Sequence, residues 1–409
     1  MAELPIVLLF FLIVAILLRM DIIFYLVYVL SGSYALAKWW AGRSLKQLTV
    51  ERRFVDHIFT GETSTVDICI RNRSVLPIPW LHYDETPPTQ LSGSTRLLQA
   101  IALGPKEQAT LHYEIAGRQR GFYPVGPGRL SSGDLFGFAE ARGSADEHRP
   151  LVVYPRVIPL VHAPLSSRSP YGTIASRQPI FADPTRVNGV RIYQPGDPIR
   201  SIDWKTSARS DQLQVKKTDP AVSLSTSIFV DLHTPAYSRA YRYSGTEWAI
   251  VVAASLANYL VEERQEVGLG SNGHDELTDA TCWSIPPRSG RNHLMKLLEW
   301  LARVQAGETR SLPEWLPQAA VNLSWGTTVI AVTATGDEAT CAALGRLYRA
   351  GLNPVLVAIE PHAHFAVIKE RCRRLGVSAF EVADEAALRR WQIRDTVTCA
   401  GAPYAHHAG

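Results

Sequence analysis

Two long apolar runs at the start of the chain constrain its fold more than any other feature. Residues 4–18 form the first run and residues 22–30 the second, and the charged side chains of Arg19 and Asp21 stand between them. A single helix through both runs would hold these charges near the middle of a bilayer, where they are costly. Two helices that meet at the charges avoid this cost. We therefore expect a transmembrane hairpin over residues 1–40.

The residues that flank the hairpin indicate its orientation. The end of the second run and the segment after it carry basic residues against a single acidic one, namely Lys38, Arg43, Lys46, Arg52 and Arg53 against Glu51. Such flanks stay on the cytoplasmic side, so we expect an inner or plasma membrane protein with its soluble domains in the cytoplasm. A cleaved signal peptide is the alternative, because Ala35-Leu36-Ala37 resembles a cleavage site. The segment before Arg19, however, has no basic residue.

Length and composition limit the number of domains and the class of protein to which the soluble part can belong. The 409 residues leave room for two or three domains. A hydrophobic fraction of 46% with 20% charged residues excludes a mainly disordered chain. The 42 basic and 38 acidic residues are too balanced for a general nucleic-acid binder. The five cysteines stand far apart without a CxxC motif, which argues against a zinc site and against a disulfide scaffold.

Residues 44–160 have the pattern of a β-sandwich. Residues 65–70 alternate apolar and polar side chains, and residues 97–103, 109–115 and 151–154 are further expected strands. Glycines and prolines separate these runs, as they do in domains built from many short strands. Nothing in this pattern points to catalysis, so we interpret the domain as a packing or presentation module.

Residues 221–400 have a different pattern, in which expected strands alternate with expected helices. The strands are at 224–230, 327–332, 354–359 and 378–382, and the helices are at 248–261, 294–304, 337–350, 365–375 and 385–392. This alternation is typical of a parallel, doubly wound α/β sheet. The expected fold class is therefore multidomain, with a helical hairpin, a β-sandwich and an α/β domain.

Residues 161–220 connect the two soluble domains and carry clear local signals. Pro195 and Gly196 fit a type II turn, because proline fixes φ and glycine supplies a positive φ. Asp197 followed by proline is a strong helix start. We therefore expect a short helix from Asp197 to about Ala208.

On that helix, Arg200 can pair with Asp203 three residues later and can stack on Trp204 four residues later. Ile199 and Ile202 are expected to face inward. An ion-pair clamp that fixes one domain against the other is one interpretation of these residues, and it packs Trp204 between the domains.

The alternative is an exposed docking surface. Between Arg186 and Lys217, seven basic residues accompany three aspartates, which leaves a local excess of positive charge. Such a patch can bind phosphate, lipid headgroups or an acidic protein surface. Lys205 and Arg209 are the expected contact residues in that case. No glycine-rich phosphate loop accompanies the patch, so nucleotide binding is unsupported.

Several stretches together resemble the family known as domain of unknown function 58. They are the N-terminal apolar pair, Arg120–Tyr123, Gly133–Phe138, Val153–Arg156 and, most specifically, Arg191–Arg209. Leu135 departs from the family pattern, which has proline there. The resemblance implies a C-terminal domain similar to the von Willebrand factor A type and partners such as MoxR-type AAA+ ATPases. The expected interaction residues are Arg191, Tyr193, Pro195, Gly196, Asp197, Arg200, Asp203, Trp204, Lys205, Ser207 and Arg209.

Domains of the A type often hold Mg²⁺ with an Asp-x-Ser-x-Ser loop after the first strand. Here Asp231 matches the aspartate, but His233 and Pro235 replace both serines. Proline has no side-chain oxygen, and a neutral imidazole is a poor ligand for Mg²⁺.

The second acidic loop of such domains is also incomplete in this chain. Ala334 stands after Thr333 where the family type has aspartate, and Asp337 is explained as a helix cap. What remains of the metal site is a degenerate loop of Asp231, Thr333 and Asp337. We therefore expect that the chain binds no cofactor. Mg²⁺ is the ion with which this expectation is to be tested.

Three classes of function compete. The favoured one is a non-enzymatic, membrane-anchored scaffold or protein-interaction module that acts with a MoxR-type ATPase in complex or envelope assembly, with no catalytic residues. The first alternative is a metal-assisted hydrolase that uses Asp231, Asp337 and His233. The second is a binder of lipid headgroups or other anionic ligands through the basic segment. Nucleic acid is not an expected partner, because the segment lacks interleaved aromatic residues. The sequence leaves the oligomeric state open.

Overall fold

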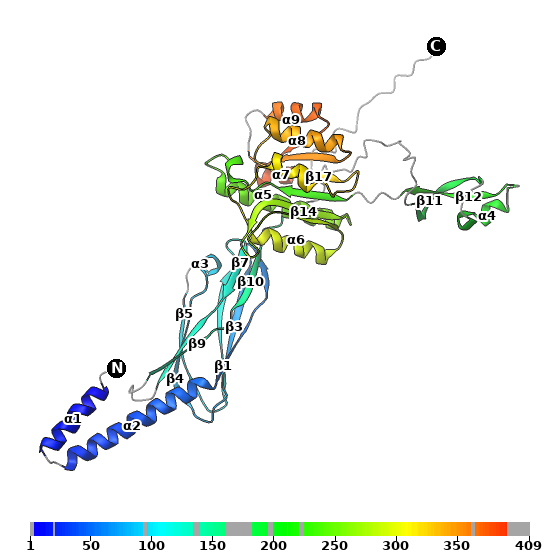
Figure 1. Cartoon of the computed structure of the whole chain (residues 1–409). Coiled ribbons are helices and arrows are strands. Elements are labelled where there is room, and N and C mark those ends of the chain that lie inside the picture. The colour runs from blue at the N-terminus through cyan, green and yellow to red at the C-terminus, as the bar shows by residue number, and fades with distance from the viewer. Residues whose placement is uncertain are drawn as a thin grey trace. The chain divides into compact units, whose positions relative to one another are not determined.

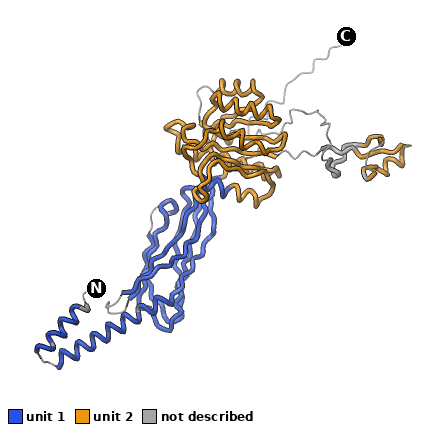
Figure 2. The backbone as a smooth tube through the Cα atoms, in the orientation of Figure 1, with its two compact units in different colours: residues 1–156, 298–304 blue, residues 157–297, 305–409 orange. Residues whose placement is uncertain are grey.

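The computed structural model describes most of the chain. The described residues are 4–18, 21–92, 96–133, 140–160, 182–194, 199–210, 212–220, 225–360 and 365–390. They divide into two compact units, which are residues 1–156 with 298–304 and residues 157–297 with 305–409 (Figure 2).

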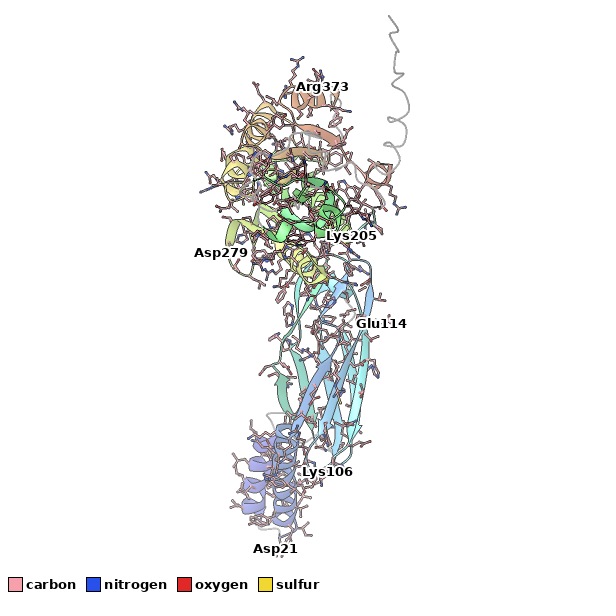
Figure 3. All side chains as sticks on the ribbon, turned by 90° about the vertical axis from the view of Figure 1, so that its right-hand side faces the viewer. Asp21, Lys106, Glu114, Lys205, Asp279 and Arg373 are labelled. Carbon is pink, nitrogen blue, oxygen red and sulfur yellow. The ribbon has the colours of Figure 1, made fainter. Side chains whose placement is uncertain are left out.

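The chain begins with two helices that lie side by side, α1 (Leu4–Leu18) and α2 (Asp21–Lys46) (Figure 1). Asp21 lies at the end where they meet (Figure 3), and Arg19 falls outside the described residues. With 26 residues, α2 is long and apolar enough to cross a membrane, whereas α1 has 15 residues and spans only about 22 Å. The second helix thus runs past the expected residue 40.

The last turns of α2 pack against the β domain. The indole Nε1 of Trp40 donates a hydrogen bond to the carbonyl oxygen of Pro77 at 3.0 Å. Leu45 contacts the hydrophobic core of that domain. The end of α2 is therefore held by the β domain as well as by its own helical hydrogen bonds.

The β domain of unit 1 consists of three sheets, with strand orders β1-β3-β6, β2-β10-β7 and β5-β4-β8-β9. Its elements are β1 (Leu48–Arg53), β2 (His57–Phe59), β3 (Thr63–Asn72), β4 (Ile78–Glu85), α3 (Thr89–Ser92), β5 (Leu97–Leu103), β6 (Gln108–Ala116), β7 (Gly121–Val125), β8 (Gly128–Gly133), β9 (Glu140–Ala145) and β10 (Arg149–Tyr154). The four expected strands are all present. On β3, alternate residues Val66, Ile68 and Ile70 are buried in a core to which all three sheets contribute.

A charged group lies inside this core. Arg52 of β1 and Glu85 of β4 have fully buried side chains, and Arg52 Nε donates to Glu85 Oε2 at 3.1 Å. Arg52 also donates to the carbonyl oxygen of Glu147 at 2.6 Å. The Tyr83 and Tyr113 hydroxyls donate to Glu85, the latter at 3.0 Å. Burial raises the pKa of both tyrosines, so they remain donors at neutral pH.

The α/β domain is built on a seven-stranded sheet, six strands of which follow the order β15-β14-β13-β17-β18-β19. Five of these run parallel, and β15 at the edge is antiparallel to β14. The strands are β13 (Thr226–Val230), β14 (Val267–Asp275), β15 (Ala280–Arg288), β16 (Val304–Gln305), β17 (Thr328–Thr333), β18 (Asn353–Ala358) and β19 (Ser378–Glu381). The helices are η2 (Thr234–Ala236), α5 (Arg242–Glu262), α6 (Arg291–Arg303), α7 (Leu312–Ala319), α8 (Glu338–Arg349), α9 (Phe365–Arg374) and α10 (Glu385–Arg390).

The β14–β15 hairpin and α7 were missed by the sequence pattern, and the sheet is mixed rather than wholly parallel. The glycines of β14 explain the first omission. A Cβ atom on Gly268 would lie 2.9 Å from the carbonyl oxygen of Ile285, and one on Gly270 would lie 2.7 Å from the Phe229 ring. Glycine here permits close packing inside a strand, although it usually weakens one. Helix α5 also begins at Arg242, six residues before the expected start at Trp248.

The ends of α8 and α9 lie within one residue of the expected positions. The Asp337 carboxylate accepts a hydrogen bond from Thr340 N at 3.0 Å and caps α8. Gly351 and Gly376 follow α8 and α9 with φ of +86° and +77°, a conformation that glycine adopts at little cost.

Candidate functional site

Residues 182–220, here called the arm, contain the most specific sequence motif. The strands β11 (Ala182–Ile192) and β12 (Gln214–Pro220) pair antiparallel, with Arg191 opposite Val215. The segment between them holds a 3₁₀ turn, η1 (Ile199–Ser201), and the short helix α4 (Trp204–Ser207). Residues 195–198, and with them Pro195, Gly196 and Asp197, lie outside the described part, as does the side chain of Arg200.

The continuous helix expected from Asp197 to Ala208 is wrong over the residues that are described. Asp203 has extended backbone angles, with φ of −88° and ψ of 92°, and it caps α4 by accepting from Thr206 N at 3.1 Å. The pairing with β12 causes the break, because Asp203 N donates to the carbonyl oxygen of Gln214 at 2.8 Å. The cap hydrogen bond holds the pKa of Asp203 below its usual value.

Trp204 does not pack into the arm, because its side chain is 64% exposed. The clamp, which would place this ring between the domains, stays a prediction. Ile202 is buried as expected, but Ile199 is 71% exposed rather than inward facing. Two motif residues support the arm internally. Ser207 Oγ accepts from Gln214 N at 2.8 Å, and Tyr193 N donates to the carbonyl oxygen of Leu213 at 2.8 Å.

The remaining motif residues face outward. Lys205, labelled in Figure 3, and Arg209 are exposed beside Trp204. Arg191 is exposed as well and donates to the carbonyl oxygen of Ile192 at 3.2 Å. The arm therefore presents apolar and cationic side chains together on one short segment.

A second candidate site lies at the carboxyl end of β13, in the centre of the α/β sheet. Asp231 is buried there, and both of its carboxylate oxygens are hydrogen bonded. Oδ1 accepts from Asn272 Nδ2 at 2.8 Å and from His233 N at 3.2 Å, and Oδ2 accepts from Thr333 Oγ1 at 2.8 Å. Burial raises the pKa of Asp231, and these hydrogen bonds oppose the rise in part.

Three partners of this site were missed by sequence reasoning. Asn272 lies on β14 and also accepts from Leu232 N at 2.6 Å. The Tyr237 hydroxyl donates to the carbonyl oxygen of Asp231, and burial raises the pKa of Tyr237. Glu360 accepts from Ser238 N at 3.2 Å. No motif marks these residues, because they come from three separate parts of the chain: inside β14, directly after η2 and shortly after β18.

The residues of the degenerate metal loop do not form a ligand set. Thr333 donates to Asp231, whereas Asp337 caps α8. Ala334 and Pro235 offer no side-chain oxygen. No group of three or more His, Cys, Asp or Glu side chains in the described ranges is placed to hold a metal ion. The donor set therefore does not fit a hard cation such as Mg²⁺.

This arrangement predicts the response to Mg²⁺. Calorimetric titration of the detergent-purified chain with Mg²⁺ to millimolar concentration should give no saturable heat, because Asp231 already has protein donors on both oxygens. A saturable signal that disappears in Asp231→Ala would contradict this and would revive the hydrolase alternative.

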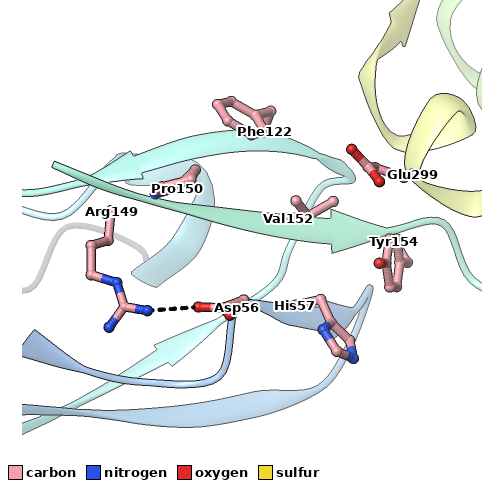
Figure 4. A pocket seen from close by; sticks show the side chains of 8 residues that line it. All are labelled: Asp56, His57, Phe122, Arg149, Pro150, Val152, Tyr154 and Glu299. Atoms are coloured by element: carbon pink, nitrogen blue, oxygen red, sulfur yellow. Dashed lines mark hydrogen bonds and ion pairs between the residues drawn. The ribbon is translucent and has the colours of Figure 1, made fainter. Parts of the chain in front are cut away.

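A pocket of about 460 Å³ lies in unit 1 (Figure 4), lined by Asp56, His57, Phe122, Arg149, Pro150, Val152, Tyr154 and Glu299. Two of its charged residues form an ion pair, since Arg149 Nη2 lies 3.1 Å from Asp56 Oδ1. Burial and the Glu299 charge raise the pKa of Tyr154. The rings of His57 and Tyr154 contact each other in the pocket, with their centroids 5.4 Å apart.

Comparison with known proteins supports the resemblance over part of the chain. A family model described as "Protein of unknown function DUF58" matches residues 189–323, which include most of the arm and Asp231. The curated "Uncharacterized protein YeaD" of Bacillus subtilis (strain 168) is 25% identical over 252 residues, or 60% of this chain and 59% of that protein. The chain thus matches about three fifths of the length of this relative.

Solved structures add little. A CARDB domain from Pyrococcus furiosus is 17% identical, covers 26% of this chain and 86% of its own, and has a TM-score of 0.19. A GH20 exo-β-N-acetylglucosaminidase from Vibrio harveyi is 9% identical, covers 82% of this chain and 75% of its own, and has a TM-score of 0.20. Such low scores carry no argument about fold or function.

Proposed function

We propose that this chain is a membrane-anchored, non-enzymatic scaffold that docks a protein partner through its arm. The observation that carries the proposal is the exposed side chain of Trp204, 64% of which is accessible, beside the exposed cations Lys205 and Arg209. Tryptophan and arginine are enriched among residues that dominate binding energy at protein interfaces. An isolated two-stranded ribbon is also marginally stable, which favours a partner that covers it.

The α/β domain carries the arm in this proposal and is of the von Willebrand factor A type. Its parallel central strands, its antiparallel edge strand β15 and the position of Asp231 at the end of β13 support that assignment. The hydrogen bonds on both Asp231 oxygens support a structural rather than a catalytic role for this residue.

The partner proposed from the family resemblance is a MoxR-type AAA+ ATPase. The positive charge of the arm requires an acidic surface on that partner, with an apolar recess for the Trp204 ring. Assembly of a complex or of the cell envelope is the process in which such a pair would act.

Substitution of Trp204 tests the docking surface. Trp204→Ala should weaken binding of the full chain to a purified MoxR-type ATPase by at least tenfold, because an exposed tryptophan at an interface is a typical hot spot. Its melting temperature should stay within about 1 °C of the parent, since surface substitutions change stability little.

Trp325 provides the matched control, because it is a tryptophan outside the arm that is 73% exposed. Trp325→Ala should bind the ATPase as the parent does. Equal affinities for Trp204→Ala and the parent would reject the arm as the docking surface for this partner.

The membrane anchor has its own test. Because α2 is long and apolar enough to span a bilayer and α1 lies against it, we propose that both helices insert, with local thinning of the bilayer at the shorter α1. Alkaline extraction should leave the chain in the membrane pellet, and its release into the supernatant would contradict the anchor.

Orientation is tested with the partly exposed thiols Cys69 and Cys282. If the soluble domains are cytoplasmic, a membrane-impermeant maleimide should label them only after the cells are permeabilised. Labelling in intact cells would reverse the orientation. Cys341 is unsuitable as a probe, because it is buried.

A further inference from the structure

Two cysteines that are far apart in sequence come together in the α/β domain. Cys341 lies in the first turns of α8 and Cys372 near the end of α9, and their Sγ atoms are 3.4 Å apart. Both side chains are fully buried, and both thiols are free. No sequence pattern indicates this pair, because 31 positions separate the two residues.

The surroundings of the pair distinguish its two sulfurs. Cys341 stands near the N-terminus of α8, where the helix dipole favours a negative charge. The hydrogen bond with Cys372 and the nearby Arg371 charge lower the pKa of Cys341 to about 7, against the opposing effect of burial. The pKa of Cys372 is raised by its hydrogen bond to Cys341 and by burial. Either sulfur can donate the hydrogen bond between them, and Cys341 Sγ also lies 3.6 Å from the carbonyl oxygen of Gly336, to which it can donate. The lower pKa makes Cys341 the more nucleophilic of the two sulfurs.

We propose that Cys341 and Cys372 form a redox-modification site, at which a peroxide converts the two thiols into an intramolecular disulfide. The Cys341 thiolate attacks one peroxide oxygen, the O–O bond breaks, and a sulfenic acid and hydroxide result. Cys372 loses its proton and attacks the Cys341 sulfur, the S–OH bond breaks, and the hydroxide leaves as water. Two thiols and one hydrogen peroxide thereby give one disulfide and two waters.

The geometry favours a bond between these two sulfurs. The two sulfurs need to approach only from 3.4 Å to about 2.05 Å, the length of a disulfide bond. The bond would tie α8 to α9 next to Gly336, whose carbonyl oxygen accepts from Arg371 Nη1 at 3.2 Å. It would therefore stiffen the segment that follows Thr333, the residue that donates to Asp231. The inference does not depend on the docking role of the arm.

Peptide mapping of the full chain in detergent tests the site. After treatment with hydrogen peroxide, free thiols are alkylated under denaturing conditions, and the digest is analysed by mass spectrometry. A linked pair of peptides that contains Cys341 and Cys372 and is two hydrogens lighter than their sum should appear, and dithiothreitol should remove it. The oxidised chain should melt roughly 5–10 °C higher, because the disulfide closes a loop of about 30 residues.

Single-cysteine variants show which of the two sulfurs reacts with the peroxide first. In Cys372→Ser, Cys341 should be trapped by dimedone as a sulfenic acid, whereas Cys372 in Cys341→Ser should remain a thiol. Cys69→Ser and Cys282→Ser serve as controls that keep the linked peptide and the thermal shift. The proposal is overturned if peroxide oxidises Cys69 or Cys282 while Cys341 and Cys372 stay alkylatable, or if the linkage found joins other cysteines.

Discussion

Replacement of Glu85 by alanine should lower the free energy of unfolding of the β domain by about 3–5 kcal/mol. Arg52 and Glu85 are fully buried, and the substitution would leave the guanidinium without its carboxylate partner. The hydroxyl of Tyr113, which donates to Glu85 at 3.0 Å, would also lose its acceptor. A buried charge without a partner retains its full desolvation cost, which explains why the loss exceeds that of an ordinary hydrogen bond.

Thermal unfolding of the purified chain measures this effect, and Glu51 supplies the control. Glu51 is on the same strand as Arg52, and its pair with Arg53 has side chains 59% and 73% exposed. Glu51→Ala should change stability by less than about 0.5 kcal/mol, because exposed ion pairs contribute little. A similar small change for Glu85→Ala would mean that water or an anion reaches Arg52 in the folded domain.

Short sequence patterns correctly predicted several strands and helix ends. Residues 65–70 alternate because one face of β3 is buried, and Asp337 caps α8 through a side chain three residues from its donor. The expected strand at 97–103 matches β5 residue for residue. In each of these cases the signal itself lies within a few consecutive residues of the chain.

The features that the sequence pattern missed depend on contacts between residues that are far apart in the chain. A helix through residue 203 is locally reasonable, but hydrogen bonding to Gln214 on β12 places Asp203 in extended conformation. Asn272 joins Asp231 from a strand 41 positions away, and Arg52 meets Glu85 across 33 positions. Only the topology of the sheets brings these groups together, so a single sequence contains no spacing that reveals them.

The largest effect in the α/β domain is expected at Asp231. Asp231→Ala removes the acceptor of the Asn272 amide and of the Thr333 hydroxyl, both buried, and should cost about 2–5 kcal/mol. Asp231→Asn keeps an acceptor oxygen and the side-chain volume, so its cost should be smaller. Melting curves of the two variants, each compared with the parent at the same pH, measure the difference. Equal costs for both variants would mean that the carboxylate charge and its second acceptor oxygen, which both variants lose, set the effect rather than the side-chain volume.

The pH dependence of Asp231→Asn reports which charge state the fold prefers. Burial raises the pKa of Asp231 in the folded chain above its unfolded value of about 3.9. The folded state then holds this proton more tightly, so the stabilisation is fully present below pH 3.9 and is lost as the pH rises through the folded pKa. Asparagine does not titrate, and the parent should therefore lose stability relative to Asp231→Asn as the pH rises from acid towards neutral.

The direction of this change separates two interpretations of the site. A carboxylate that is held ionised by a bound cation has a lowered pKa, and the parent would then gain stability relative to Asp231→Asn as the pH rises from acid. Melting temperatures of both proteins at several pH values, measured with a chelator and with millimolar Mg²⁺, distinguish the signs. A gain on raising the pH that requires Mg²⁺ would show that Asp231 binds the ion. A loss that is the same in both buffers is expected if Asp231 serves the fold through Asn272 and Thr333.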